Sequence, residues 1–375
     1  MRIKSRLAGV LAATAAVGLL AAGCGNSNDS SNTSSAAATT AAATSAAGSS
    51  AAGGGDVAGK NACVMLPDAD SSSRWENGDR PALTAGFKAI GMTVDIQNAL
   101  NDTGKYATLA EQQLTKGCDV MLLVDLNGAG AAVVTKAKAQ GIPVIAYDRP
   151  IAGADFYISF DNFHVGELQG QMLVDALKAK GTDIAKANIV YVGGDPTDGN
   201  AKQFHDGADS VLKAAGMVKP AFETPGAWSA EKSGTAFEQA MTALQGKVDA
   251  VWAANDINAG AVIQVLDKNG LTVPVSGQDA SPIGLQNILL GKQTATVYKP
   301  FKLEADAAVQ LSQQLMAGTP PTVDKKDTTG VPFIAETPVV VDVKNMQQVF
   351  DDGNAKVAEV CTGDVAAKCT AAGIK

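Results

Sequence analysis

Polar side chains stand at the ends of at least six short apolar runs in this chain, and each carries a charge or an amide. They are Asp68, Asp148 with Arg149, Asp195 with Asp198, Asn255 with Asp256, Gln278 with Asp279, and Lys299. In an open α/β sheet the carboxyl ends of the strands face one crevice, so side chains at those ends converge on whatever binds there. The pattern therefore predicts a cage around a ligand, built from distant segments of the chain.

The elements that would position this cage alternate between strand and helix. Expected strands cover residues 62–66, 92–97, 120–124, 142–147, 155–160, 188–192, 218–223, 250–253, 273–276, 294–298 and 338–343. Expected helices cover residues 79–90, 105–116, 129–140, 165–180, 200–215, 229–245, 259–269, 282–290 and 302–317, with one short helix after the last strand. This alternation indicates βα units and a parallel sheet, followed by a second, similar cycle.

The folded part, from about residue 60 to the C-terminus, exceeds the usual single-core limit of about 250 to 300 residues. We therefore expect an α/β fold with two doubly wound parallel-sheet lobes joined by a multi-strand hinge. The first lobe is expected at residues 60–162 with about 299–327, and the second at residues 163–298 with about 328–352. Residues 353–375 are expected to form a C-terminal tail.

Residues 1–23 have the character of a secretory signal peptide, with a basic start and a short uncharged run that ends in small residues. The run is shorter than the roughly 20 residues of a comfortable membrane span. Cys24 follows directly and resembles the cysteine that takes a lipid in bacterial lipoproteins, although an ordinary signal peptide with an incidental Cys24 remains an alternative. We therefore expect an extracytoplasmic protein that is lipid-anchored to the cell membrane.

Residues 24–59 consist almost wholly of small and polar residues. Such a stretch cannot bury enough apolar surface to offset the entropy of ordering it, so we expect a flexible tether behind the lipidated cysteine. A helix in its Ala-rich part is the alternative, and it is weakened by the Thr, Ser and Gly residues that interrupt every short Ala run.

The four remaining cysteines suit an oxidising exterior, because their even number permits two disulfides. Cys63 and Cys118 stand at the starts of two expected strands, which are neighbours in a flavodoxin-like strand order, so we expect them to be bonded. Cys361 and Cys369 would close a small loop in the tail. Free buried thiols are the alternative for both pairs. A metal site is not expected, since no histidine lies near any of the four.

The charge of the chain limits its partners. The formal net charge is −8, and removal of the signal peptide with Arg2, Lys4 and Arg6 takes it to −11. A nucleic-acid partner needs a basic face, and no Lys/Arg cluster follows residue 6. We expect a monomer with no nucleic-acid partner and no cofactor.

Several segments in order, between about residues 62 and 318, resemble the D-xylose-binding proteins of bacterial sugar ABC importers. They are residues 73–75 (SRW), 146–150 (AYDRP), 155–162 (DFYISFDN), 166–169 (GELQ), 276–280 (SGQDA) and 296–300 (TVYKP). The resemblance implies a type I periplasmic-binding-protein fold that closes on one monosaccharide and delivers it to the permease of an ABC importer. A sugar-sensing receptor without a transport role is the alternative.

The sugar contacts implied by this resemblance fall on ten residues. They are Arg74, Trp75, Asp148, Arg149, Asp198, Asn200, Trp228, Asn255, Asp279 and Lys299. The sequence departs from the family at Gly199, where the family has a second asparagine, and at residues 71–73, three serines in place of bulkier, charged residues. The departures leave xylose, another pentose and a hexose as possible ligands.

The chemistry of these residues suits a sugar independently of the resemblance. Sugar hydroxyls donate and accept hydrogen bonds, which carboxylates and cations such as Asp148 and Lys299 can satisfy. Trp75 and Trp228 supply flat faces for the C–H groups of the ring. Each residue also has a plainer interpretation: Asp148 and Arg149 as a surface ion pair, Trp75 as a core residue, Trp228 as a helix-start staple and Asn255 as a helix cap.

Two other classes of protein, an enzyme and a repressor, fit the sequence less well than a binding protein does. A hydrolase triad has little to build on, because His164 and His205 do not adjoin a recognisable nucleophile motif. A glycosidase-like carboxylate pair stays open as a less favoured alternative, since Arg149 and Lys299 favour ionised acids. A sugar-responsive repressor would need a DNA-binding head, whereas this chain begins with the expected signal and tether. We therefore expect a binding protein and no enzyme.

Overall fold

The computed structural model describes residues 57–69, 71–224, 226–323 and 325–375. The predicted signal peptide, the predicted lipidation site Cys24 and nearly all of the predicted tether lie outside these described residues. Within the described part of the chain, no helix is both long enough and apolar enough to cross a bilayer.

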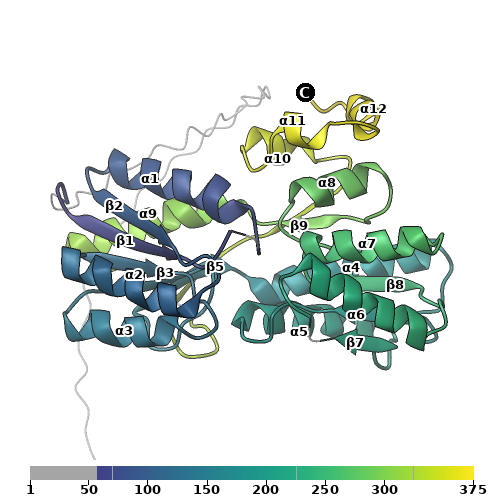
Figure 1. Cartoon of the computed structure of the whole chain (residues 1–375), viewed down its shortest axis with the longest axis horizontal. Coiled ribbons are helices and arrows are strands. Elements are labelled where there is room, and N and C mark those ends of the chain that lie inside the picture. The colour runs from purple at the N-terminus through teal and green to yellow at the C-terminus, as the bar shows by residue number, and fades with distance from the viewer. Residues whose placement is uncertain (1–56, 70, 225, 324) are drawn as a thin grey trace, which may run out of the picture. The chain divides into compact units, whose positions relative to one another are not determined.

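The first lobe is built on a six-stranded parallel sheet with the order β2-β1-β3-β4-β5-β10 (Figure 1). Its strands are β1 (Asn61–Leu66), β2 (Thr93–Asn98), β3 (Val120–Leu123), β4 (Val144–Tyr147), β5 (Phe156–Phe160) and β10 (Phe333–Glu336). Its helices are α1 (Arg80–Ala89), α2 (Thr103–Lys116), α3 (Gly130–Ala139) and α9 (Phe301–Met316). Side chains alternate across β1, so that Val64 packs with α1 and α9 whereas Met65 packs with α2 and α3.

The second lobe contains a three-stranded parallel sheet with the order β7-β6-β8. Its strands are β6 (Ile189–Val192), β7 (Phe222–Thr224) and β8 (Ala250–Ala253), and an antiparallel pair, β9 (Thr296–Tyr298) with β11 (Val339–Val341), belongs to the same lobe. Its helices are α4 (Asn162–Ala179), α5 (Gly199–Ala214), α6 (Ala230–Ala243), α7 (Asp256–Lys268) and α8 (Pro282–Leu289). Helices α4 and α5 cover one face of the β6 strand, and α6 and α7 cover the other.

Helices α4 and α5 approach each other closely. A Cβ atom added at Gly166 would lie 2.1 Å from the carbonyl oxygen of Phe204, and one at Gly207 would lie 2.1 Å from that of Phe163. Only glycine allows two backbones to come this near. The start of α5 is set separately, by the Asp198 side chain that caps it.

The chain crosses between the lobes three times, after β5, after β9 and after β10. The last crossing corrects the expected boundary near residue 328. Because β10 pairs with β5 in the first lobe, the return to the second lobe comes after Glu336 instead.

Several expected strands are shorter than predicted, and proline accounts for two of them. The segment 273–276 forms only a single bridge, between Val275 and Val251, since the preceding Pro274 has no N–H to donate. Strand β7 starts at Phe222 and not at residue 218, because Pro220 interrupts the segment. A π-helical turn, Trp75–Asp79, precedes α1 and was not expected.

Three short helices follow β11, where the sequence predicts a single one, and the last two of them lie in the C-terminal tail. They are α10 (Gln347–Asp351), α11 (Val357–Val360) and α12 (Val365–Ala371), and they lie beside α8 of the second lobe (Figure 1). A disulfide joins Cys361 to Cys369 within this tail. A second disulfide joins Cys63 of β1 to Cys118, just before β3, so both expected pairings are present in the structure.

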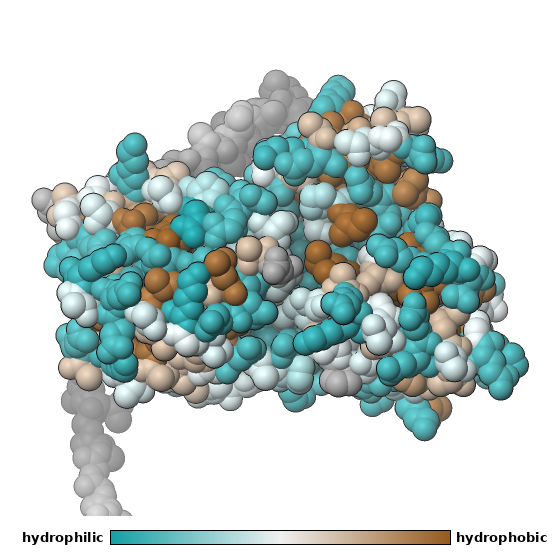
Figure 2. Space-filling view, in the orientation of Figure 1, coloured by the Kyte–Doolittle hydropathy of each residue, from teal (hydrophilic) through white to brown (hydrophobic). Residues whose placement is uncertain are grey.

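The surface is mainly hydrophilic on the face seen in Figure 2, where apolar side chains form small, separate groups. A broad apolar docking surface is therefore not a feature of this face. Many buried polar side chains gather in the cleft between the two lobes instead.

Candidate ligand-binding site

A cavity between the lobes collects all ten residues predicted to bind the ligand. Its empty space amounts to about 320 Å³, a figure that includes the open mouth. The lining residues are Ser71, Ser72, Arg74, Trp75, Asp148, Arg149, Asp198, Asn200, Phe204, Trp228, Asn255, Gln278, Asp279 and Lys299. The structure therefore brings the predicted residues together around one cavity.

Strand ends and helix starts position most of these side chains. Asp148 follows β4 and Lys299 follows β9, so both stand at carboxyl ends of strands. Asp198 caps α5 and Asn255 caps α7, with their side chains accepting hydrogen bonds from the backbone N–H groups of Asn200 and Asn258. The convergence of strand ends that the sequence predicts thus produces one cluster.

Arg74 is the centre of a buried ion-pair network in the first lobe. Its Nε and Nη2 atoms donate to the two carboxylate oxygens of Asp79, both at 2.7 Å. Nη2 also donates to Glu304 at 2.7 Å, and Nη1 donates to Asp148 at 2.8 Å. Burial disfavours the charged guanidinium, but the three acids outweigh it and raise the pKa of Arg74 well above its ordinary value. The group is therefore a fixed cation.

Asp148 links this network to the cavity. Its Oδ2 lies 2.8 Å from Arg74 Nη1 and 3.9 Å from Lys299 Nζ, and Lys299 lies 3.4 Å from Asp279 Oδ1. Burial opposes ionisation of Asp148, but Lys299, Arg74 and Arg149 together outweigh it and lower its pKa. Asp148 is consequently a carboxylate, ready to accept hydrogen bonds from a ligand.

Asp148 and Asp279 both have a left-handed backbone conformation, with φ angles of 62° and 92° respectively. Aspartate tolerates this region better than most residues, but it remains uncommon for any residue with a Cβ. Such local strain often accompanies functional positions. Here it turns two carboxylates from different lobes toward the same cavity.

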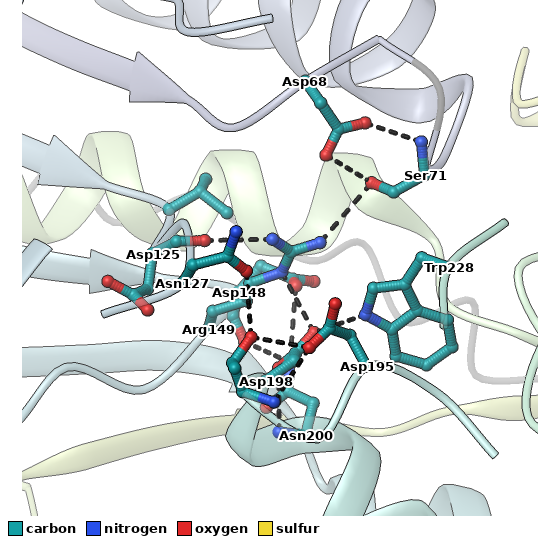
Figure 3. A network of polar contacts seen from close by, with 12 residues as sticks. Asp68, Ser71, Asp125, Asn127, Asp148, Arg149, Asp195, Asp198, Asn200 and Trp228 are labelled. Atoms are coloured by element: carbon teal, nitrogen blue, oxygen red, sulfur yellow. Dashed lines mark hydrogen bonds and ion pairs between the residues drawn. The ribbon is translucent and has the colours of Figure 1, made fainter. Parts of the chain in front are cut away.

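Arg149 bridges the two lobes at the mouth of the cavity (Figure 3). Its Nε lies 3.1 Å from Asp198 Oδ2, and its Nη1 donates to the carbonyl oxygen of Asp125 at 2.9 Å. The indole Nε1 of Trp228 donates to the same Asp198 oxygen at 3.0 Å. Burial raises the pKa of Asp198 even though Arg149 opposes the rise. The cleft is therefore closed in this structure by a polar network.

A neighbouring hydrogen bond also joins the lobes across the mouth. Thr197 Oγ1 lies 2.9 Å from Asn127 Oδ1, to which it donates. Deeper in the cleft, Asn200 donates through Nδ2 to the carbonyl oxygen of Asp148 at 2.8 Å, and Tyr157 donates to Asn200 Oδ1 at 3.1 Å. These contacts keep the start of α5 against the first lobe.

Trp75 differs from expectation. The sequence favours a position at the rim of the site or against the ligand for Trp75. Only 2% of Trp75 is exposed, however, and it belongs to the core of the first lobe. The π-helical turn folds it inward, where Nε1 donates to Ser71 Oγ at 3.1 Å. The Arg74 guanidinium lies 4.7 Å from the centre of its ring. Trp75 is therefore both a core residue and part of the cavity wall.

Trp228 lies just before α6, and Gly194 makes room for it. A Cβ atom added at Gly194 would lie 2.2 Å from the Trp228 ring, so no larger residue fits there without a shift. The Trp228 ring also packs edge-on against Phe204, at 6.4 Å between ring centres. Its bond to Asp198 and its place in the cavity wall favour a ligand role over a helix-start staple.

Five residues of the site were not predicted from the sequence. Ser71, Ser72 and Phe204 line the cavity, and Asp79 and Glu304 lie behind Arg74. Phe204 lies one helical turn after Asn200, so spacing offered a signal for this residue. Asp79 and Glu304 carry no such signal, since acids near or within amphipathic helices are usually solvent-exposed.

Two neighbouring acids outside the list have structural roles. Asp256 is buried and accepts hydrogen bonds from Gln293, Ser281 and Thr296. Asp195 accepts from Thr197 and lines the outer mouth and not the inner cavity. Among the described residues, no group of three potential metal-ligating side chains is found.

Known proteins with similar sequence or structure identify the family. The family model of the periplasmic binding protein domain matches residues 63–320. The D-xylose-binding periplasmic protein of Escherichia coli (strain K12) is 38% identical over 300 residues, which cover 76% of this chain and 88% of that protein. The multiple sugar-binding periplasmic receptor ChvE of Rhizobium radiobacter is 32% identical over 324 residues, which cover 79% of this chain and 91% of the receptor.

Solved structures agree with this family. An ABC transporter solute binding protein from Clostridium phytofermentans with bound β-D-glucose matches with a TM-score of 0.72 at 28% identity, and the match covers 80% of this chain and 100% of that chain. The fold is that of the type I periplasmic binding proteins, whose members here are substrate-binding proteins and not enzymes. The chain therefore belongs to the periplasmic binding protein family, in the group that includes the D-xylose-binding periplasmic proteins.

Proposed function

We propose that this chain is an extracytoplasmic solute-binding lipoprotein that captures a monosaccharide, D-xylose or a related sugar, between its lobes and delivers it to an ABC importer. The observation that carries the proposal is the arrangement of buried acids, cations and indoles around one small cavity. Asp148 offers acceptors, Lys299 offers donors and Trp228 offers a flat face, which is the combination that a sugar ring requires. Relatives that are named for sugar binding support the class of ligand.

Closure of the cavity supports a single sugar unit as the ligand. The Arg149–Asp198 pair separates the cavity from the outer mouth, and the empty space is only about 320 Å³ even with the open mouth included. D-xylose is our first candidate because two D-xylose-binding periplasmic proteins are 38% and 37% identical to this chain. Ordinary binding proteins of this kind discriminate sugars through buried polar groups that the wrong ligand leaves unpaired.

Binding is tested by thermal unfolding of the mature protein with D-xylose, other pentoses and hexoses, followed by calorimetry. A ligand at 100 times its Kd adds about 2.7 kcal/mol of stability, so a true ligand stands out from the panel. We expect D-xylose or a close relative to give the largest shift. A flat response to every monosaccharide would refute sugar capture, and product formation by the pure protein would refute a purely binding role.

The membrane anchor is proposed from Cys24, which follows the signal-like segment. Lipid on this residue would keep the binding domain at the membrane, close to a permease. We expect the protein to fractionate with membranes in its host and a Cys24→Ala variant to be released. Membrane association unaffected by Cys24→Ala would exclude this anchor without touching the sugar proposal.

A further inference from the structure

The donor groups of Arg74 can be assigned one by one. A guanidinium has five N–H groups. Four of them are occupied, two by Asp79, one by Glu304 and one by Asp148. The remaining N–H is on Nη1 and has no partner among the residues that the structure describes, while Arg74 lines the cavity. One donor of this cation is thus left for a ligand.

Glu304 is the unusual member of this network. It lies on α9, its exposed fraction is 0%, and its Oε2 accepts from Arg74 Nη2 at 2.7 Å. Its other oxygen, Oε1, is buried and has no hydrogen-bond partner among the described residues. Asp79 differs, because Arg74 and the Tyr147 hydroxyl donate to its two oxygens. A buried carboxylate with a bare oxygen is costly, so Glu304 is better accommodated as the neutral acid.

The charged and titratable groups that act on Glu304 come from the π-helical turn, from β4 and its end, and from β5. They are Arg74 and Asp79 from the π-helical turn and the residue before it, Tyr147 and Asp148 from β4 and its end, and Tyr157 from β5. Arg74 is the single cation in this set, and Asp79 and Asp148 already share it. Burial, opposed only in part by Arg74, raises the pKa of Glu304 to about 8.

We propose that Glu304 is a positioning residue of the sugar site, a neutral carboxyl group that holds one edge of the Arg74 guanidinium and leaves the last Nη1–H of Arg74 free for the ligand. The proposal rests on sugar capture at this cavity. As the neutral acid, Glu304 takes only one N–H of Arg74. As a carboxylate it would compete for both N–H groups on the Nη1–Nη2 edge in the bidentate manner that arginine favours, and the ligand would lose its donor.

The test is the pH dependence of the Kd for D-xylose, measured by calorimetry between pH 6.5 and pH 9. If only the neutral form of Glu304 supports binding, a pKa of about 8 makes the Kd rise about tenfold between pH 7 and pH 9. Glu304→Gln copies the neutral acid, so it should bind within about threefold of the wild type at pH 7 and keep that affinity at pH 9. A wild-type Kd that is constant over this range, or the same rise in Glu304→Gln, would overturn the proposal.

The matched control is Asp306→Asn, which makes the same acid-to-amide change at an exposed position of the same helix. Its affinity and pH profile should follow those of the wild type. A profile flattened by Asp306→Asn as much as by Glu304→Gln would mean that the net charge of the protein, and not Glu304, sets the pH dependence, and would also overturn the proposal.

A measurement without ligand separates this inference from the proposed function. A folded-state pKa above the unfolded one gives stability that is complete below the unfolded pKa and is lost as the pH rises through the folded pKa. The Tm of the wild type should therefore fall relative to that of Glu304→Gln from about pH 4.5 to about pH 8 and then run parallel. If no sugar binds at any pH, sugar capture fails while this profile still tests the proton on Glu304. Parallel Tm curves throughout would refute the neutral acid.

Discussion

The two walls of the cavity are held in different ways. On the first-lobe wall, Arg74 forms buried ion pairs with Asp79 and Asp148 and donates a hydrogen bond to Glu304. On the second-lobe wall, Asp198 and Asn255 are held by the backbone at the starts of their own helices. A helix cap depends on its neighbours in sequence, whereas an ion-pair network depends on all its members. A mutation in the first wall should therefore weaken ligand binding through the whole network. A mutation in the second wall should affect only the contact of the mutated residue.

The largest effect is expected for Asp148→Asn on the first wall. Asparagine keeps the shape and tolerates the left-handed backbone, but it removes the charge that Arg74 and Lys299 share. The site loses charge-assisted hydrogen bonds to the ligand, at about 1.5 to 3 kcal/mol each, and Arg74 and Lys299 lose the acid that orients them, so the Kd for the sugar should rise about a hundredfold in calorimetry. Glu111→Gln, an exposed acid of the same lobe, serves as the control. A rise in Kd of less than threefold for Asp148→Asn would contradict the prediction that the first wall acts as a unit.

A smaller effect is expected for Asp279→Asn on the second wall. Asp279 pairs with Lys299 at 3.4 Å, and Lys299 retains Asp148 nearby when Asp279 is neutralised. The loss is then one charge-assisted hydrogen bond to the ligand, about 2 kcal/mol or roughly thirtyfold in Kd. Asparagine is chosen because alanine would be strained at a φ of 92°. A loss equal to that of Asp148→Asn would erase the difference between the walls.

The smallest effect is expected for Trp228→Phe. Phenylalanine retains an aromatic face in the wall but loses the Nε1–H that donates to Asp198. Asp198 keeps Arg149 and the backbone N–H of Asn200, so we expect a loss of about 1 kcal/mol, or roughly fivefold in Kd. A fall of a hundredfold or more would show that the Trp228 indole is coupled into a network as tight as that of the first wall.

The sequence predicted most of this site because its residues follow regular strands and helices. Strand ends of a parallel sheet converge by geometry, so Asp148, Lys299 and the caps Asp198 and Asn255 could be grouped without knowing any distance. The support behind Arg74 could not be predicted. Glu304 is an acid on an amphipathic helix far along the chain, and only tertiary packing buries it against Arg74. The burial of Trp75 could not be predicted for a similar reason, since a π-helical turn places it against the core of the first lobe as well as in the cavity wall.

The fold was predicted best where the apolar runs are long. The order of the first five strands of the first sheet can be predicted from its βα units. The edge strand β10 could not be placed in this way, because it comes from a distant segment that is half-buried along its length. Sequence patterns indicate that such a segment is a strand, but not which sheet it joins. The error in the boundary near residue 328 has this origin.

The three crossings after β5, β9 and β10 have a consequence for how ligand uptake can be followed. Three connections between the lobes restrict their relative motion mainly to rotation about one hinge axis. A single interlobe distance, reported by one pair of spectroscopic labels on opposite rims, would then suffice to read the occupancy of the protein in real time.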